Sequence, residues 1–105
     1  MNFNQFTIKA QEAVQKAQQL ATQQGQQAIE TGHLLKGLLE ADENVLPYLF
    51  KKLGVNGSTI AQALDRIVSS YPKVSGGEVY LSSQAQQVIN KAVAVMSEMK
   101  DEFVA

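Results

Sequence analysis

Small and apolar residues recur every three or four positions in five segments of the chain, which is the period of one face of an α-helix. The first segment runs from Ile8 to Gln24, and Thr7 precedes it as a candidate N-cap while Gly25 follows as a stop. Its apolar positions are Ala10, Ala13, Val14, Ala17, Leu20 and Ala21. The pattern predicts a helix with one buried face and one exposed face rich in glutamine and lysine.

Two shorter helices are predicted next. The second begins at Thr31, the expected cap, and its apolar face ends near Ala41. The third spans Val45–Leu53 and carries Pro47 near its start, where a missing N–H costs little. Gly54 follows as its stop signal.

The fourth and fifth helices flank the one obvious linker. Ser58 is the candidate cap of the fourth helix, which should end before Pro72 because the residue before a proline disfavours helix. Residues 72–81 contain a pair of glycines and are predicted to form a loop with an extended end at Val79-Tyr80-Leu81. Ser82 is the expected cap of the fifth helix. The apolar face of that helix comprises Ala85, Val88, Ile89, Ala92, Val95, Met96 and Met99.

An internal repeat relates the first and fifth helices. Adding 75 to the number of Thr7 gives Ser82, and each apolar position of the first helix then meets a small or apolar residue. The register continues beyond the helix, where Ala28-Ile29 corresponds to Phe103-Val104. Helical repeats bury their faces against each other. We therefore expect an all-α helical-repeat domain with a first repeat over 1–71, an inter-repeat loop over 72–81 and the start of an incomplete second repeat over 82–105, within a longer domain.

Composition narrows the functional classes. A chain of 105 residues is one domain at most, and its net charge of -1 argues against a general nucleic-acid binder. The absence of cysteine excludes disulfides, thiolate metal sites and a cysteine nucleophile, and it suits a reducing cytosol. No apolar run approaches the roughly 20 residues that span a bilayer. We expect a cytoplasmic protein with neither nucleic acid nor membrane as partner.

The residues that could carry chemistry do not form a catalytic pattern. Gly76-Gly77 is followed by glutamate and valine rather than by the lysine and hydroxyl residue of a phosphate-binding loop. His33 is the only histidine, and a role at a helix start is favoured over a metal or relay role. Asp42-Glu43 and Asp101-Glu102 are expected to be solvated turns. The sequence predicts no enzymatic activity, no cofactor and no metal for this chain.

Three short motifs resemble the amino-terminal domains of ClpB-type disaggregases, and the likeness covers all 105 residues. They are Phe6-Thr7-Ile8-Lys9-Ala10-Gln11-Glu12-Ala13, then Ile29 with His33-Leu34-Leu35, then Tyr71-Pro72-Lys73-Val74-Ser75-Gly76-Gly77. The resemblance implies a pseudo-twofold, all-α domain ahead of two ATPase modules in a hexameric ring. It implies that the domain engages unfolded or aggregated chains and aids their delivery to the pore, with a DnaK-type chaperone system as collaborator and ATP bound only in the parent protein.

A related alternative stays open. In Clp protease unfoldases of the ClpC and ClpA type the same fold docks an adaptor protein or substrate, although the loop from Pro72 to Gly77 looks more like ClpB. Gly32 departs from the family pattern, in which an acidic residue usually precedes the histidine. That departure leaves the local hydrogen bonding to be determined.

The resemblance also implies site residues. Substrate engagement in the family is linked to a surface near the two helix caps that open the repeats, and the matching polar positions are Thr7, Ser82 and Asp101. Leu81, Phe103 and Val104 are the apolar neighbours, which either belong to the core or line a groove for extended apolar segments. Thr7 and Ser82 could equally be plain caps, each worth about 1 kcal/mol. The groove is expected where the starts of the first and fifth helices approach each other.

Overall fold

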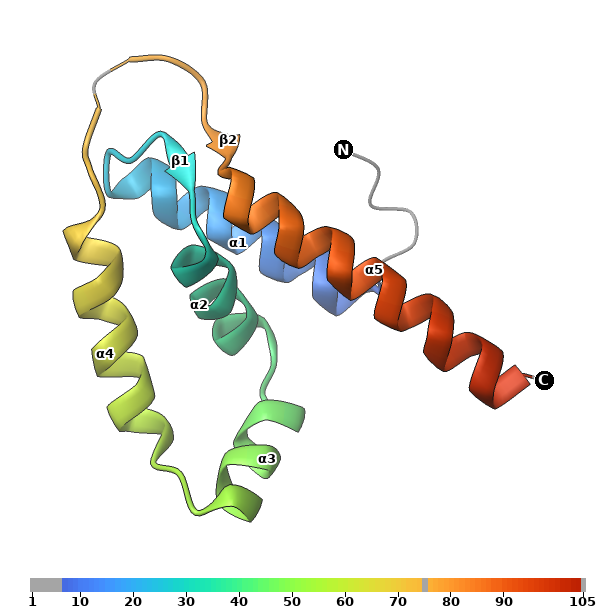
Figure 1. The fold of residues 1–105 in the computed structure, drawn as a ribbon. Coiled ribbons are helices and arrows are strands. Elements are labelled where there is room, and N and C mark those ends of the chain that lie inside the picture. Colours follow the sequence, from blue (N-terminus) through green and yellow to red (C-terminus); the bar gives the residue numbers. More distant parts are fainter. Residues whose placement is uncertain (1–6, 75, 105) are drawn as a thin grey trace.

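The fold is a set of helices with one short pair of strands (Figure 1). The computed structural model describes residues 7–74 and 76–104, without the side chains of Met96 and residues 99–104. The helices are α1 (Ile8–Gln23), α2 (Thr31–Ala41), α3 (Val45–Leu53), α4 (Gly57–Ser70) and α5 (Ser83–Val104). The strands are β1 (Ala28–Ile29) and β2 (Tyr80–Leu81). The predicted all-α class is confirmed, and none of the helices in the described ranges is both long and apolar enough to cross a membrane.

Both helices that open a repeat begin on a hydroxyl cap. The Thr7 side chain accepts a hydrogen bond from the Ala10 N–H at 3.1 Å, and the Ser82 hydroxyl accepts one from the Ala85 N–H at the same distance. Gly25 follows α1 with a φ of 70°, a left-handed conformation that glycine adopts without strain. The predicted caps and the predicted stop are therefore confirmed.

Two other predicted caps were wrong by one or two residues. The N-cap of α2 is Glu30 rather than Thr31, and its backbone N–H donates to the His33 side chain. The N-cap of α4 is Asn56 rather than Ser58. The Asn56 side chain accepts from two backbone N–H groups, and asparagine caps as well as serine does.

The start of α3 is held by a carboxylate that the sequence suggested was only solvated. Asp42 accepts hydrogen bonds from the backbone N–H groups of Asn44, Val45 and Leu46 at 3.0, 3.0 and 2.6 Å. The bond from Leu46, followed by those from Val45 and Asn44, lowers the pKa of Asp42. Asp42 lies in the turn between α2 and α3, as expected, and its carboxylate in addition closes the first turn of α3.

The strand pair fixes where α5 starts. β1 and β2 are parallel, with Ala28 opposite Tyr80 and Ile29 opposite Leu81. The Tyr80 N–H donates to the Gln27 carbonyl and the Ser82 N–H donates to the Ile29 carbonyl, both at 3.0 Å. Because β1 follows α1 directly, this pairing places the start of α5 next to the chain that leaves the end of α1 (Figure 1).

The core lies where α1, α2 and the strands meet. Ala17, Ala21 and Ile29 are buried there, with Leu34, Val79 and Leu81 packed against them. The small residues of α1 let α2 approach closely at Gly37, where an added Cβ would overlap the Ala13 carbonyl oxygen and lie 3.0 Å from the Ala17 nitrogen. Leu64 and Val68 are the buried residues of α4, which packs against α2.

The face predicted for α5 is only partly buried. Ala85 and Ile89 are buried, while Val88 is 50% exposed. The helix also runs on to Val104, whereas the repeat register predicted a helix end and then a counterpart of β1 at Phe103-Val104. Lys100 stands where the shift of 75 would place the glycine that ends α1, so this position lacks the left-handed residue that stops a helix.

Candidate functional site

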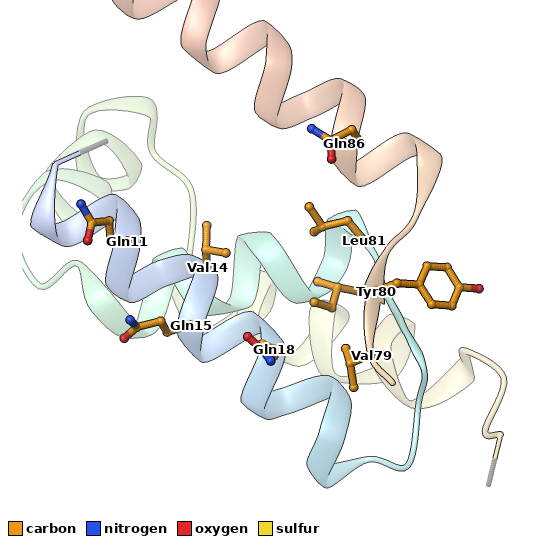
Figure 2. A pocket seen from close by; sticks show the side chains of 9 residues that line it. Gln11, Val14, Gln15, Gln18, Val79, Tyr80, Leu81 and Gln86 are labelled. Carbon is orange, nitrogen blue, oxygen red and sulfur yellow. The ribbon is translucent and has the colours of Figure 1, made fainter. Parts of the chain in front are cut away.

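A groove of about 540 Å³ opens between α1 and the junction of β2 with α5 (Figure 2). Figure 2 shows the Val79 and Leu81 side chains directed toward α1 and the Tyr80 ring directed away from it, which is the alternation expected of an extended segment. Val14 faces them from α1. These three aliphatic side chains give the groove an apolar floor. The full lining is Gln11, Val14, Gln15, Gln18, Ile29, Val79, Tyr80, Leu81 and Gln86.

Glutamine amides form much of the groove wall. Three of them project from α1 and one, Gln86, from the first turns of α5. An amide side chain both donates and accepts hydrogen bonds without carrying a charge. None of the residues that line the groove in the described part of the chain is charged. The groove therefore suits neutral polar groups alternating with apolar side chains.

The sequence-predicted site residues fall into three places. Leu81 lines the groove, and Ser82 is the cap of α5 directly beyond it. Thr7 lies at the start of α1, and Figure 1 shows the start of α5 near the other end of α1. The expectation that these two starts approach each other was therefore wrong. The β1–β2 pairing is the reason, since it ties the start of α5 to the far end of α1.

The remaining predicted contacts lie on the last turn of α5. The backbone of Asp101, Phe103 and Val104 belongs to this helix, but their side chains lie outside the described part of the structure. Thr7 and Ser82 show the hydrogen bonds of ordinary caps, so the structural role proposed for them is present. Their role in binding stays a prediction.

A buried polar network connects α2 with α4. His33 is fully buried, and its Nδ1 accepts the Glu30 N–H at 2.9 Å, so this nitrogen carries no proton. Nε2 then holds the proton and donates to Gln26 Oε1 at 2.7 Å. The Gln26 amide nitrogen donates to the Val68 carbonyl at 2.6 Å, which fixes the orientation of the amide. The network thus defines one tautomer of a neutral His33.

Burial determines how His33 titrates. Desolvation lowers the pKa of His33 below 6.5, and Lys36 also lowers the pKa while Glu30 raises it. The Nδ1 that would take up a proton already accepts a backbone N–H, so the imidazolium has no place in this network. His33 therefore performs the structural helix-start role favoured by the sequence, and it also links α2 to Gln26. The burial of Gln26 could not be predicted, because most glutamines of this chain read as exposed helix surface.

Gly32, which departs from the family pattern, contacts the Tyr71 side chain. The Gly32 N–H donates to the Tyr71 hydroxyl at 3.2 Å, and a Cβ at Gly32 would lie 2.5 Å from that oxygen. The Tyr71 ring also packs near the His33 ring, with centroids 5.1 Å apart. The aromatic side chain after α4 thus occupies the space that a side chain at position 32 would need.

Comparison with known proteins decides the family. The family described as the Clp repeat (R) N-terminal domain matches residues 5–105. The chain belongs to this family. Over 105 residues it is 52% identical to the chaperone protein ClpB of Bacteroides thetaiotaomicron and 46% identical to that of Porphyromonas gingivalis. It is 37% identical over 106 residues to the chaperone protein ClpB 2 of a Nostoc species.

The Clp repeat match covers nearly the whole chain but a small part of each relative. All of this chain aligns with the Bacteroides and Porphyromonas proteins and 99% of it with the Nostoc protein, yet it spans only 12% of the length of each. The resemblance read from the motifs is thus confirmed at the level of the family.

Proposed function

We propose that this chain is the substrate-engaging N-terminal domain of a ClpB-type, ATP-dependent disaggregase. The observation that carries the proposal is the 52% identity to a ClpB chaperone over the full chain. The groove between α1, β2 and α5 would take extended segments of unfolded or aggregated polypeptide and aid their delivery to the ATPase ring.

The groove composition supports this use. Val14, Val79 and Leu81 offer apolar contact to side chains of any shape, and the glutamine amides offer hydrogen bonds to any backbone. Such a surface does not discriminate between sequences, because it has neither a charge nor a deep pocket to select a particular side chain. Weak binding with rapid release follows, since little of the ordering cost of an unfolded segment is recovered.

The parent protein is part of the same proposal. We expect a hexameric AAA+ ATPase that binds ATP in modules outside this chain, works with a DnaK-type chaperone system in the cytoplasm and uses neither nucleic acid nor membrane as partner. An N-domain of a ClpC- or ClpA-type unfoldase, which would take an adaptor or a substrate, is the alternative. The relatives named above are all ClpB chaperones, and this favours the disaggregase.

A titration with a chemically unfolded model protein tests the groove. Val14→Gln is expected to weaken binding about fivefold, because one aliphatic contact of about 1 kcal/mol is lost. Chemical-shift changes in the NMR spectrum should concentrate on residues 11–18, 79–81 and 86. Val88→Gln is the matched control, since Val88 is exposed on α5 and does not line the groove. It should bind like the wild type.

The same titration separates the predicted contacts. Thr7→Ala, Ser82→Ala and Asp101→Ala are compared after circular dichroism has shown that each variant is folded, because losing a cap alone lowers stability. Loss of affinity in Ser82→Ala supports an extension of the groove toward the cap of α5. Shifts that map to α2 and α4 instead, or equal weakening by Val14→Gln and Val88→Gln, would refute the groove assignment while leaving the family unchanged.

A further inference from the structure

The α3 helix exposes apolar side chains that its own fold does not cover. None of its residues is buried, although Leu46 and Phe50 turn partly inward. The outward face follows the three-four spacing of a helix stripe. Leu53 is 74% exposed, Val45 61% and Tyr48 58%. The complete stripe is Val45, Tyr48, Leu49, Lys52 and Leu53. Figure 1 shows α3 away from β2 and the start of α5, so this face is separate from the groove.

Positive charge gathers at the C-terminal end of the stripe. Lys51 and Lys52 lie in the last turn of α3, and among the described residues neither has a carboxylate within salt-bridge distance. The Lys52 amine lies 5.6 Å from the centroid of the Tyr48 ring, so it is held over the apolar face. The negative end of the helix dipole favours cations, which accounts for the two lysines at the C-terminal end of α3. It does not account for the apolar side chains exposed beside them.

One hollow borders the stripe, and a second lies behind it, on the side of α3 that faces α4. One of about 410 Å³ is lined by Tyr48, Lys51 and Lys52. The other, of about 490 Å³, is mostly apolar and lies between α3 and the first turns of α4. It is lined by Leu39, Pro47, Phe50, Lys51, Val55, Gly57 and Ala61. Lys51 thus lines both hollows, and each hollow can receive side chains of a binding partner.

Charge and shape together select one kind of occupant. A second copy bound through the same patch would add two more lysines to the interface and no carboxylate from α3, because this helix has no acidic residue. A lipid surface would gain only about 1 kcal/mol for each of the two lysines, and it has no side chains to fill the hollows. A partner helix can insert apolar side chains and place carboxylates opposite the lysines.

We infer that α3 docks a short amphipathic helix of another protein, whose apolar face is flanked by aspartate or glutamate. The inference is independent of the proposed function, because it uses a different surface. It assigns the chain a second contact, which a partner could use while the groove holds a substrate segment.

The test uses two synthetic helical peptides that differ only in charge. Both carry leucines on one face, flanked by glutamates in the first and by glutamines in the second. NMR titration of the 105-residue chain should show shifts confined to residues 39–61 with the acidic peptide and roughly fivefold weaker binding of the neutral one. The double variant Lys51→Glu/Lys52→Glu should bind the acidic peptide at least about tenfold more weakly. Lys91→Glu, exposed on α5, should bind it like the wild type.

Four results would overturn the inference. They are equal affinity for the two peptides, equal weakening by Lys91→Glu, shifts that map to the groove, and concentration-dependent dimerisation through α3 seen by light scattering.

Leu53→Ser adds a test of the apolar part of the stripe. It changes a side chain that is 74% exposed, so folding should be unaffected while binding of both peptides weakens. Co-sedimentation with anionic vesicles that Leu53→Ser abolishes would reassign α3 to a lipid surface.

Discussion

Replacing His33 by leucine is expected to lower the free energy of unfolding by about 3 kcal/mol, because the substitution leaves two polar groups without their partners. The Gln26 carbonyl oxygen would lose the donor at 2.7 Å, and the Glu30 N–H would lose its acceptor at 2.9 Å. Urea unfolding followed by circular dichroism measures the change. The matched variant Gln26→Leu and the double variant complete a cycle. The double variant should lose less than the sum, since the two side chains share one hydrogen bond.

The same residue should make stability depend on pH. Burial lowers the pKa of His33 in the folded chain below 6.5, so between that lowered pKa and about 6.5 the unfolded chain binds more protons. The free energy of unfolding therefore rises with pH across this window. The contribution is fully present above about 6.5 and is lost as the pH falls toward the folded-state pKa. In His33→Leu this part of the pH dependence should vanish. An unchanged slope, or strictly additive effects in the cycle, would show that the network does not act as described.

Gly37→Ala should destabilise the chain by roughly 3 kcal/mol or prevent folding, although alanine is the better helix former. The new Cβ would overlap the Ala13 carbonyl oxygen and press on the backbone nitrogen of Ala17. Both atoms belong to a helix backbone, which cannot turn aside as a side chain can. The helices α1 and α2 would have to separate, and the core around Ala17 and Ala21 would open. Thermal unfolding of the wild type and the variant measures the effect.

Gly57→Ala is the control for Gly37→Ala. Gly57 is the first residue of α4, and a Cβ there would meet only the Phe50 ring, at 3.4 Å or more. We expect a change within about 1 kcal/mol, because the helix gain and the new contact are both small. If Gly37→Ala were as mild as Gly57→Ala, α1 and α2 could not be as close as the structure places them.

Local signals predicted the helices well. The hydroxyl caps Thr7 and Ser82 and the left-handed Gly25 are determined by residues within a few positions, so the sequence was enough to find them. Asn56 was missed as a cap because Ser58, which caps equally well, offered a competing start, and Glu30 was missed because glutamate is not a preferred N-cap residue. Leu81 lines the groove between α1 and the start of α5, and its role in binding stays a prediction.

Packing between segments that are distant in the sequence could not be predicted from the sequence. The relative direction of α1 and α5 depends on the pairing of Ala28-Ile29 with Tyr80-Leu81, two segments too short to show a strand pattern. Gln26 became a buried bridge only because Val68 lies opposite it in the fold. The need for glycine at position 37 comes from the α1 backbone that it contacts, which is distant in the sequence. The capping role of Asp42 was not predicted, because the three N–H groups that donate to it come together only when α3 forms.

We propose that this chain captures non-native polypeptide for a disaggregase through the groove. The most direct test of this proposal is a chimera in which the chain replaces the aligned segment of the ClpB of Bacteroides thetaiotaomicron. The measured quantity is the rate at which aggregated protein is reactivated, with ATP hydrolysis as the control. We predict that the chimera restores the rate lost on deleting the segment, that Val14→Gln lowers it and that Val88→Gln does not. A chimera that reactivates aggregates no faster than the deletion variant, or whose rate Val14→Gln leaves unchanged, would refute the proposed role of the groove.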